Sequence, residues 1–336
     1  MIARSTARGQ GPTSWQRALA DAVRTPAELL TLLGLPPEDG PGVRAGLAQF
    51  PLRVPRGFMR RMRPGDRHDP LLLQVLPVAE EGRAVPGFGF DPVGDLGAVA
   101  APGVLHKYRG RVLLVATGAC AVHCRYCFRR AFPYQEANAR AANWRGALDY
   151  IAGDDTIEEV ILSGGDPLML ADRSLHEFTD ALRGIRHVRR LRLHTRLPIV
   201  LPERVDEGLL AWLEALPWQT VVVVHCNHAR ELDGEVAAGF GALRTAGATL
   251  LNQAVLLRGV NDDAGALRDL SEGLFAQGVL PYYLHLLDRV AGAAHFEVEE
   301  ARAQALMHEL RAALPGYLVP RLVREVAGEE YKRPLI

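Results

Sequence analysis

The chain carries the stretch VLLVATGACAVHCRYC at residues 112–127, in which an apolar run leads directly into three closely spaced cysteines. The run Val112–Thr117 has the composition of a buried strand. Cys120, Cys124 and Cys127 follow it with the spacing CxxxCxxC. Soft thiolates on a loop at a strand end suit iron–sulfur chemistry, and three of them can hold three irons of a cubane and leave the fourth open.

Downstream of this stretch, short apolar runs alternate with helical patterns. Five more strands are predicted at Glu159–Ser163, Leu191–Thr195, Thr220–His225, Thr249–Val255 and Tyr282–Leu287. Helices are predicted at Trp144–Ile151, Ser174–Ile185, Asp206–Leu216, Gly234–Ala246, Ala264–Gln277 and Val298–Ala313. Strands that alternate with helices imply a parallel α/β sheet. Periodicity alone permits an open doubly wound sheet or a curled partial barrel, and both place the site at the carboxyl ends of the strands.

The segments before and after these alternating strands and helices differ from them in sequence pattern. Residues 1–103 read as a helical and irregular extension, in which Thr25-Pro26 is the expected cap and first turn of a second helix. Residues 104–297 hold the alternating strands and helices. Residues 298–336 comprise a helix, the extended segment Tyr317–Val326 and a short tail, with no room for a second globular domain after residue 316.

Composition narrows the function classes. The 336 residues carry 39 basic and 39 acidic side chains, a balance that argues against a dedicated nucleic-acid binder. No apolar stretch approaches ~20 residues, so no membrane span is expected. The polar opening, Met1 to Trp15, has no signal-peptide pattern, which predicts a cytoplasmic protein. Three of the four cysteines cluster, which points to metal or cluster ligation, and Cys226 is predicted to be a small buried residue.

Zinc is the main alternative for the cysteines. A structural zinc would need four closed ligands, with His123 as one of them. A second CxxC pair is absent, however, and a strand-end loop at a barrel mouth does not suit a closed structural metal. The spacing CxxxCxxC, with Tyr126 before its last cysteine, is the signature of the radical S-adenosylmethionine superfamily. The turn Gly164-Gly165-Asp166 after the second strand resembles that superfamily's segment for the methionine amino group.

Over nearly its full length the sequence resembles lysine 2,3-aminomutases. The resemblance is carried by His106–Phe132, Ile161–Leu168, His194–Pro202, His225–His228, Asn252–Asp262 and Val319–Pro334. Ser14-Trp15, Pro51–Pro55 and the short tail resemble the short bacterial branch that acts in elongation factor P modification. The fold implied is a radical S-adenosylmethionine partial (β/α)6 barrel with a mainly helical N-terminal extension and a short C-terminal tail.

The resemblance implies three cofactors: a [4Fe-4S] cluster, S-adenosylmethionine and pyridoxal 5′-phosphate. Lys332, one of only two lysines, matches the lysine that binds pyridoxal phosphate covalently, and the scarcity of lysine and the Lys-x-Pro context favour that role over an exposed terminal lysine. Tyr108 and Arg111, with Lys107 as a third, would bind its phosphate. His225 and Gln253 would join the glycine turn in contacting S-adenosylmethionine, whereas His194 and Arg196 could face either cofactor.

For the substrate, the resemblance implies an anion clamp and a distal cation site. Arg129 matches the carboxylate-binding arginine, since a guanidinium can hold a carboxylate with two parallel hydrogen bonds. Asp288 and Glu325 match the acids that hold the distal ammonium, and Glu325 stands where the larger enzymes have aspartate. Ordinary surface ion pairs are the alternative for both acids. Asp263 replaces a zinc-binding cysteine of those enzymes, so no such zinc is predicted.

The predicted reaction is therefore that of an isomerase, an intramolecular aminotransferase that converts L-α-lysine to β-lysine. A donor protein such as flavodoxin or ferredoxin would supply the electron for this reaction. Elongation factor P and its lysyl ligase would use the product. The alternatives are an aminomutase of free lysine metabolism or, in another class, a non-catalytic iron–sulfur or zinc protein acting as electron carrier or assembly factor. Glutamate is disfavoured as a substrate because Asp288 and Glu325 would repel its side chain.

Overall fold

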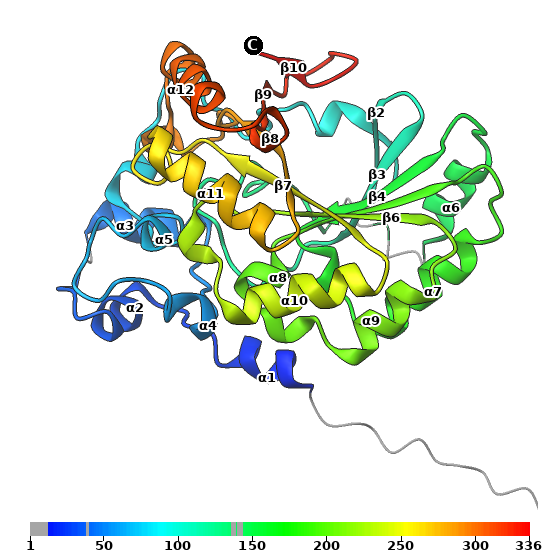
Figure 1. The fold of residues 1–336 in the computed structure, drawn as a ribbon, viewed down its shortest axis with the longest axis horizontal. Coiled ribbons are helices and arrows are strands. Elements are labelled where there is room, and N and C mark those ends of the chain that lie inside the picture. Colours follow the sequence, from blue (N-terminus) through cyan, green and yellow to red (C-terminus); the bar gives the residue numbers. More distant parts are fainter. Residues whose placement is uncertain (1–12, 38–39, 136–138, 140–143) are drawn as a thin grey trace, which may run out of the picture.

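The computed structural model describes residues 13–37, 40–135, 139 and 144–336, which fold around one large sheet (Figure 1). Within them, ten strands pair in chain order from β1 to β10. The six predicted strands are all present, as β3 (Arg111–Thr117), β4 (Glu159–Gly164), β5 (Arg190–Thr195), β6 (Gln219–Val224), β7 (Thr249–Val255) and β8 (Leu280–His285).

Seven neighbouring strands run parallel. The strands β3 to β8 pair in parallel, and β9 (Arg321–Arg324), inside the predicted extended segment, adds to β8 in the same direction. Short antiparallel strands flank them: β1 (Val99–Ala101), β2 (Val104–Tyr108) and β10 (Arg333–Pro334). An open doubly wound sheet reverses its strand order at a switch point. The strictly sequential order therefore selects the partial barrel from the two predicted alternatives.

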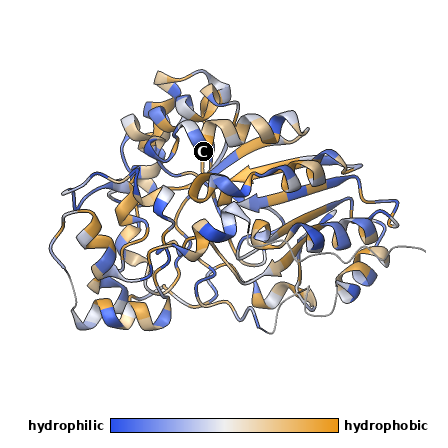
Figure 2. Cartoon of the chain, turned by 90° about the horizontal axis from the view of Figure 1, so that it is seen from below, coloured by the Kyte–Doolittle hydropathy of each residue, from blue (hydrophilic) through white to orange (hydrophobic). Residues whose placement is uncertain are grey.

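The predicted helices connect the strands along the outside of the sheet (Figure 1). They are α6 (Arg145–Ala152), α7 (Asp172–Leu182), α9 (Glu207–Glu214), α10 (Gly234–Thr245), α11 (Ala264–Ala276) and α12 (Glu300–Ala313), joined by the unpredicted short helix α8 (Leu197–Val200). Figure 2 shows that the helices combine hydrophilic and hydrophobic residues, as helices with one buried face do. Asp263 caps α11, because its side chain accepts a hydrogen bond from the Ala266 N–H.

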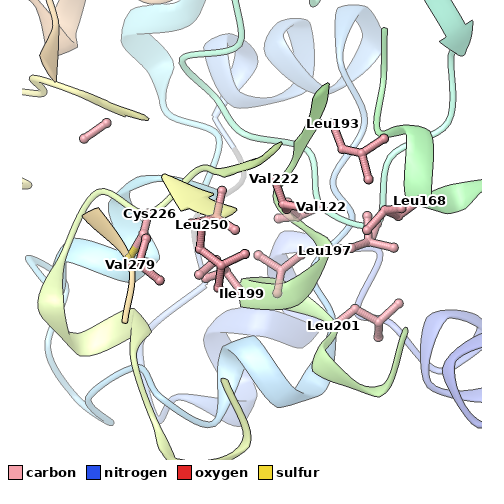
Figure 3. Packing of buried hydrophobic residues seen from close by; sticks show 14 of the residues in the cluster. Val122, Leu168, Leu193, Leu197, Ile199, Leu201, Val222, Cys226, Leu250 and Val279 are labelled. Atoms are coloured by element: carbon pink, nitrogen blue, oxygen red, sulfur yellow. The ribbon is translucent and has the colours of Figure 1, made fainter. Parts of the chain in front are cut away.

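The strands alternate between a face toward the helices and a face toward the interior of the barrel. In β5, Leu191 and Leu193 are fully buried, whereas Arg192 and His194 face the interior. Register aligns Leu193 with Leu162 of β4 and with Val222 of β6, which in turn faces Leu250 of β7. Figure 3 shows Leu193, Val222 and Leu250 in one packed cluster. The apolar core thus lies between sheet and helices, and the interior face is left free for polar side chains.

Cys226 belongs to that core and not to the cysteine loop. It is fully buried, and it lies among apolar side chains in Figure 3. Its main-chain N–H donates to the Asn252 side chain at 2.9 Å. The prediction of a small buried residue is confirmed.

The N-terminal part forms short helices beside the barrel (Figure 1). They are α1 (Ser14–Ala20), α2 (Pro26–Leu32), α3 (Pro41–Gln49), α4 (Arg56–Met59) and α5 (Pro70–Leu73), with 3-10 turns at η1 (Ala79–Gly82) and η2 (Leu96–Ala98). Thr25 caps α2 by accepting a hydrogen bond from the Glu28 N–H, as predicted. Further 3-10 turns follow at η4 (Pro167–Met169), η5 (Pro202–Arg204), η6 (Ala229–Glu231), η7 (Ala294–Phe296) and η8 (Gly316–Leu318).

A buried ion pair ties this part to the cysteine loop. Glu81 accepts from the Arg125 Nε at 2.8 Å, and Arg130 also reaches Glu81 at 2.7 Å. Burial raises the pKa of Glu81, but the two guanidinium groups outweigh that effect and hold it below its usual value. Because Arg125 lies between two predicted cluster ligands, the extension and the loop depend on each other. None of the helices in the described ranges is long and apolar enough to cross a membrane.

We expect Glu81→Gln to destabilise the protein strongly, because it leaves the buried Arg125 without a counter-charge. Breaking a buried pair by removing one partner costs about 3–5 kcal/mol. The free energy of unfolding, measured by denaturant titration, should fall by that amount. Glu177→Gln is the matched control, since its pair with Arg173 is exposed and should change stability by about 0.5 kcal/mol or less. Equal effects of the two substitutions would show that the buried ion pair of Glu81 does not stabilise the protein.

Candidate active site

The carboxyl ends of the parallel strands open on a cavity of about 360 Å³. Every residue that the sequence predicted for the site lines this cavity, and several polar neighbours join them. The predicted residues are Tyr108, Arg111, Cys120, Cys124, Cys127, Arg129, Gly164, Gly165, Asp166, His225, Gln253, Asp288, Glu325 and Lys332. The structure therefore brings together groups that lie on or just after strands β2 to β9, and groups from the tail.

The cysteine loop follows β3 and presents three free thiols to the cavity. The Cys127 N–H donates to the Cys124 carbonyl at 3.0 Å, which turns the loop back on itself. Burial, followed by the neighbouring Cys124, raises the pKa of the Cys127 thiol to about 11. Burial likewise raises the pKa of Cys120. Among the described residues, no group of three His, Cys, Asp or Glu side chains is arranged to hold a single metal ion.

Arg196 lies under this loop and so faces the cysteines. Its Nη1 is 2.7 Å from the Cys124 Sγ and donates to the Tyr126 hydroxyl at 2.7 Å. Its Nη2 donates to Gln74 at 2.6 Å and to Glu231 at 2.9 Å. Gln74 and Glu231 are fully buried, so the guanidinium is held rigidly.

His194 is the other residue whose orientation the sequence left open, and it lies beside His225. Its ring makes an edge contact with His225, with the centroids 5.7 Å apart. Burial, and then the charge of Arg192, hold the pKa of His194 well below its usual value. Burial also lowers the pKa of His225 to about 3. Both imidazoles are therefore neutral, and Arg196 alone of the basic pair carries a charge.

The glycine turn after β4 is built on the end of β3. Gly164 has φ +113°, a conformation that favours glycine, and the Gly165 N–H donates to the Thr117 carbonyl at 2.7 Å. A Cβ on Gly165 would lie 2.4 Å from the Ala119 carbonyl oxygen. Asp166 lines the cavity, but its carboxylate accepts from four donors: Thr195 Oγ1 and the N–H groups of Leu168, Arg196 and Leu197. Its role in this structure is to fix the turn against β5.

Asp95, which the sequence did not single out, organises the anion clamp. It accepts from the Arg129 Nε and lies against the Lys107 ammonium, each at 2.6 Å. Arg129 also donates to Ser163 at 3.2 Å and stacks on the Phe128 ring at 4.8 Å. Burial raises the pKa of Asp95, but the two cations outweigh burial and lower it. No signal marked Asp95 because it lies in the irregular, Gly- and Pro-rich part of the extension.

Glu325 gathers both lysines of the chain. The Lys107 ammonium lies 3.1 Å from Glu325, and the Lys332 ammonium forms a shorter ion pair with it. Burial raises the pKa of Glu325, but Lys332 and then Lys107 lower it to about 2. Lys107 is in β2 and Glu325 follows β9, so the pair bridges the two edges of the open barrel.

Tyr108 and Arg111 face each other across the tight turn between β2 and β3, where Gly110 has φ +76°. The Arg111 guanidinium lies over the Tyr108 ring at 4.6 Å. Asp288 is different, because it is half-buried and forms no ion pair among the described residues. Burial and the charge of Glu325 raise its pKa to about 7, despite the opposing effect of Lys332.

Three buried polar atoms on neighbouring strand ends have no hydrogen-bond partner within the described residues. They are the His225 Nε2, the Gln253 Oε1 and the His285 Nε2. All three residues line the cavity. Buried polar atoms are normally satisfied, so such a set indicates a bound polar ligand. The sequence analysis did not single out His285, which ends β8 two residues before the predicted strand end at Leu287.

These features fit the implied cofactors. Three free thiols suit an iron–sulfur cluster, a turn with no room for a Cβ suits a closely approaching ligand, and the cavity holds a primary amine beside an anion clamp. A partial parallel barrel with this loop after its first parallel strand defines a radical S-adenosylmethionine enzyme.

Comparison with known proteins gives the particular family. The chain is 48% identical to an L-lysine 2,3-aminomutase of Escherichia coli and 47% identical to one of Haemophilus influenzae. The alignments cover 96% and 95% of this chain and 94% of each relative. The chain therefore belongs to the lysine 2,3-aminomutase family, in its short branch. A radical SAM methyltransferase structure from Sphaerobacter thermophilus matches 66% of this chain and 68% of its own, at 17% identity and a TM-score of 0.45. No family model matches.

We expect Gly165→Ala to weaken S-adenosylmethionine binding about tenfold or more, because its Cβ would collide with the Ala119 carbonyl and displace the turn. Equilibrium binding to the reconstituted protein, followed by calorimetry, measures the change. Gly146→Ala is the control, since its Cβ meets no atom within 4 Å in α6 and should leave affinity unchanged. Normal affinity in Gly165→Ala would show that the turn does not contact the ligand.

Proposed function

We propose that this protein converts L-α-lysine to β-lysine with a [4Fe-4S] cluster, S-adenosylmethionine and pyridoxal 5′-phosphate. The observation that carries the proposal is that the cysteine loop, the glycine turn, the Arg129 clamp and both lysines line one cavity. An electron carrier or a zinc protein would have no use for a lysine and an arginine clamp beside the thiols. The family relationship supports the same reaction.

When bound, the cluster and S-adenosylmethionine supply a 5′-deoxyadenosyl radical, and pyridoxal phosphate carries the migrating nitrogen. The residues of this chain position the reacting groups. Cys120, Cys124 and Cys127 would hold the cluster, and the Gly164–Asp166 turn would hold the methionine end of S-adenosylmethionine. Lys332 would bind pyridoxal phosphate, with Tyr108 and Arg111 at its phosphate.

Arg129 is placed to hold the substrate carboxylate. The Arg129 Nε donates to Asp95 and its Nη1 donates to Ser163. Its Nη2 remains for a ligand in the cavity that Arg129 lines. The ion pair with Asp95 and the stacked Phe128 keep the guanidinium from moving. An anion held in this low-dielectric cavity is bound more strongly than in water.

Glu325 supplies the distal cation site, and the structure contains a stand-in for the substrate group. The Lys332 ammonium that contacts Glu325 is the same chemical group as the ε-ammonium of lysine. With Lys332 engaged by pyridoxal phosphate, the ε-ammonium of the substrate would take its place at Glu325, near Asp288, while Lys107 keeps its ion pair with Glu325.

We further propose that the product serves the β-lysylation of elongation factor P in the cytoplasm. The support is the match to short relatives over 94% of their length and the need of a free-thiol cluster for a reducing compartment. Deleting the gene should remove β-lysine from elongation factor P, as measured by intact-protein mass spectrometry. Loss of β-lysine from the free pool with an unchanged elongation factor P would instead assign the enzyme to free lysine metabolism.

The proposed reaction is tested by mass spectrometry after anaerobic reconstitution with all three cofactors, reductant and L-lysine. We expect β-lysine from the wild type and none above detection from Lys332→Ala. Borohydride reduction should fix pyridoxal phosphate on the Lys332 peptide, and a chain with two lysines makes that assignment unambiguous. Lys107→Arg is the control, because it keeps the positive charge at position 107 and should leave the label on Lys332. Labelling of Lys107 instead, or β-lysine from Lys332→Ala, would disprove the assignment.

We expect lysine affinity to depend on the protonation of Asp288. Its pKa of about 7 means that it is neutral in acid and gains a charge that attracts an ammonium as the pH rises. Affinity should rise by up to about tenfold per pH unit below neutrality and level off above it. The neutral His225, with a pKa of about 3, does not titrate in that range.

The measurement is the lysine dissociation constant as a function of pH in the reconstituted enzyme. Asp288→Asn should remove the pH step and weaken binding about 10- to 100-fold above neutral pH. Asp269→Asn, at an exposed position, should leave the profile unchanged. A step of the same size in Asp288→Asn would assign the titration to another group.

A further inference from the structure

A strap of the extension, Phe50–Val54, lies directly on the cysteine loop. The Arg53 Nη1 donates to the Cys120 carbonyl at 2.9 Å, and the Arg53 carbonyl accepts from the His123 N–H at 3.1 Å. The His123 ring stacks on Phe50 with the centroids 4.9 Å apart, and its Nδ1 bonds to a strap carbonyl at 2.7 Å. The strap is therefore hydrogen-bonded to the loop through both main chain and side chains.

Arg24 lies beside Arg53 on the outer side of this strap. Val23 and Val54 exchange main-chain hydrogen bonds of 2.8 and 2.9 Å in an antiparallel bridge, so the next residue, Arg24, is opposite Arg53. Arg24 is exposed and makes no ion pair within the described part of the chain, while Arg53 is half-buried. Burial and then the charge of Arg24 lower the pKa of Arg53. The positive charges of Arg24 and Arg53 therefore lie close together, next to Cys120.

The charge of the surrounding segment is unusual for this chain. Residues 13–67 contain nine arginines and five acidic residues, although the full chain is neutral. Of the neighbouring acids, Asp21 and Glu28 both pair with Arg56, at 2.9 and 2.6 Å. Neither pairs with Arg24. The positive charge on the strap is therefore left for a partner.

We propose that Arg24 and the strap form the docking site of an acidic one-electron donor protein. The inference rests on the proposed function, because a radical enzyme needs one electron for each activation. The donor is oxidised by one electron and the centre held by the three cysteines is reduced by one, with no bond made or broken in the protein. Electron transfer weakens steeply with distance, so a donor must approach where the covering layer is thin. Arg53 spans that layer, because it runs from the surface to the Cys120 carbonyl.

Charge complementarity gives the chemistry of the partner. A basic patch attracts an acidic surface, orients it and raises the association rate by 10- to about 1,000-fold at low salt. A nucleic acid would also be attracted by arginines. It would gain nothing, however, from a patch bonded to the cysteine loop, and the neutral chain offers no extended basic footprint.

The test is stopped-flow reduction of the reconstituted cluster, followed by its visible absorbance, with an acidic reduced flavodoxin as the probe. This readout needs neither lysine nor pyridoxal phosphate, so it remains valid if the substrate assignment fails. We expect Arg24→Glu to lower the second-order rate constant about tenfold at low salt, with the difference shrinking as salt rises. Arg24→Lys should retain most of the rate.

Two controls separate docking from other effects. Arg186→Glu makes the same charge change at an exposed site that precedes β5, at the end of the sheet opposite the cavity, and should reduce normally. Dithionite, a small reductant that needs no docking, should reduce all variants at the same rate. Equal flavodoxin rates in Arg24→Glu and Arg186→Glu would overturn the proposal. So would a parallel loss with dithionite, or a loss of binding to an RNA oligonucleotide while flavodoxin reduction stays normal.

Discussion

Seven strands that run in the same direction impose the main constraint on this molecule, because all their carboxyl ends meet at one mouth. Each strand needs a helical crossover to return, and the helices take the apolar face of the sheet. The opposite face is then free for Arg192, His194, Gln253 and His285, which would be too polar for a core. The site is thus a consequence of strand direction, and its chemistry follows from which residues end each strand.

A cavity that gathers so many charges must balance them inside a low-dielectric space. Asp95 balances Arg129 and Lys107, and Glu325 balances Lys107 and Lys332. Lys107 is shared, so the two carboxylates form one continuous network across the edges of the open barrel. Asp288 forms no ion pair with this network among the described residues, and burial, together with the charge of Glu325, raises its pKa to about 7.

Sequence reasoning succeeded where a signal was local. The strands from Val112 to Val255 were found from apolar runs, and the cysteines and glycine turn from their spacing. The partial barrel could not be chosen from periodicity, because strand order is a property of long-range pairing. Asp95 and the orientation of Arg196 were beyond reach for the same reason. Asp95 meets Arg129 across 34 residues and Arg196 meets Gln74 across 122, and no local pattern encodes such contacts.

The extension is part of the site and not an appendage to the barrel. Residues before β2 supply Asp95 for the clamp, Gln74 for the Arg196 network, and Glu81 and Arg53 for the cysteine loop. A cluster loop with three thiols has little internal structure of its own, since its residues cannot bury one another. Its shape must come from the surroundings, and here it comes from the contacts that Arg125 and His123 of the loop make with the extension and from Arg53, which donates to the Cys120 carbonyl. The same contacts that shape the loop also hold the extension against the cysteines, so the two parts of the chain depend on one set of residues.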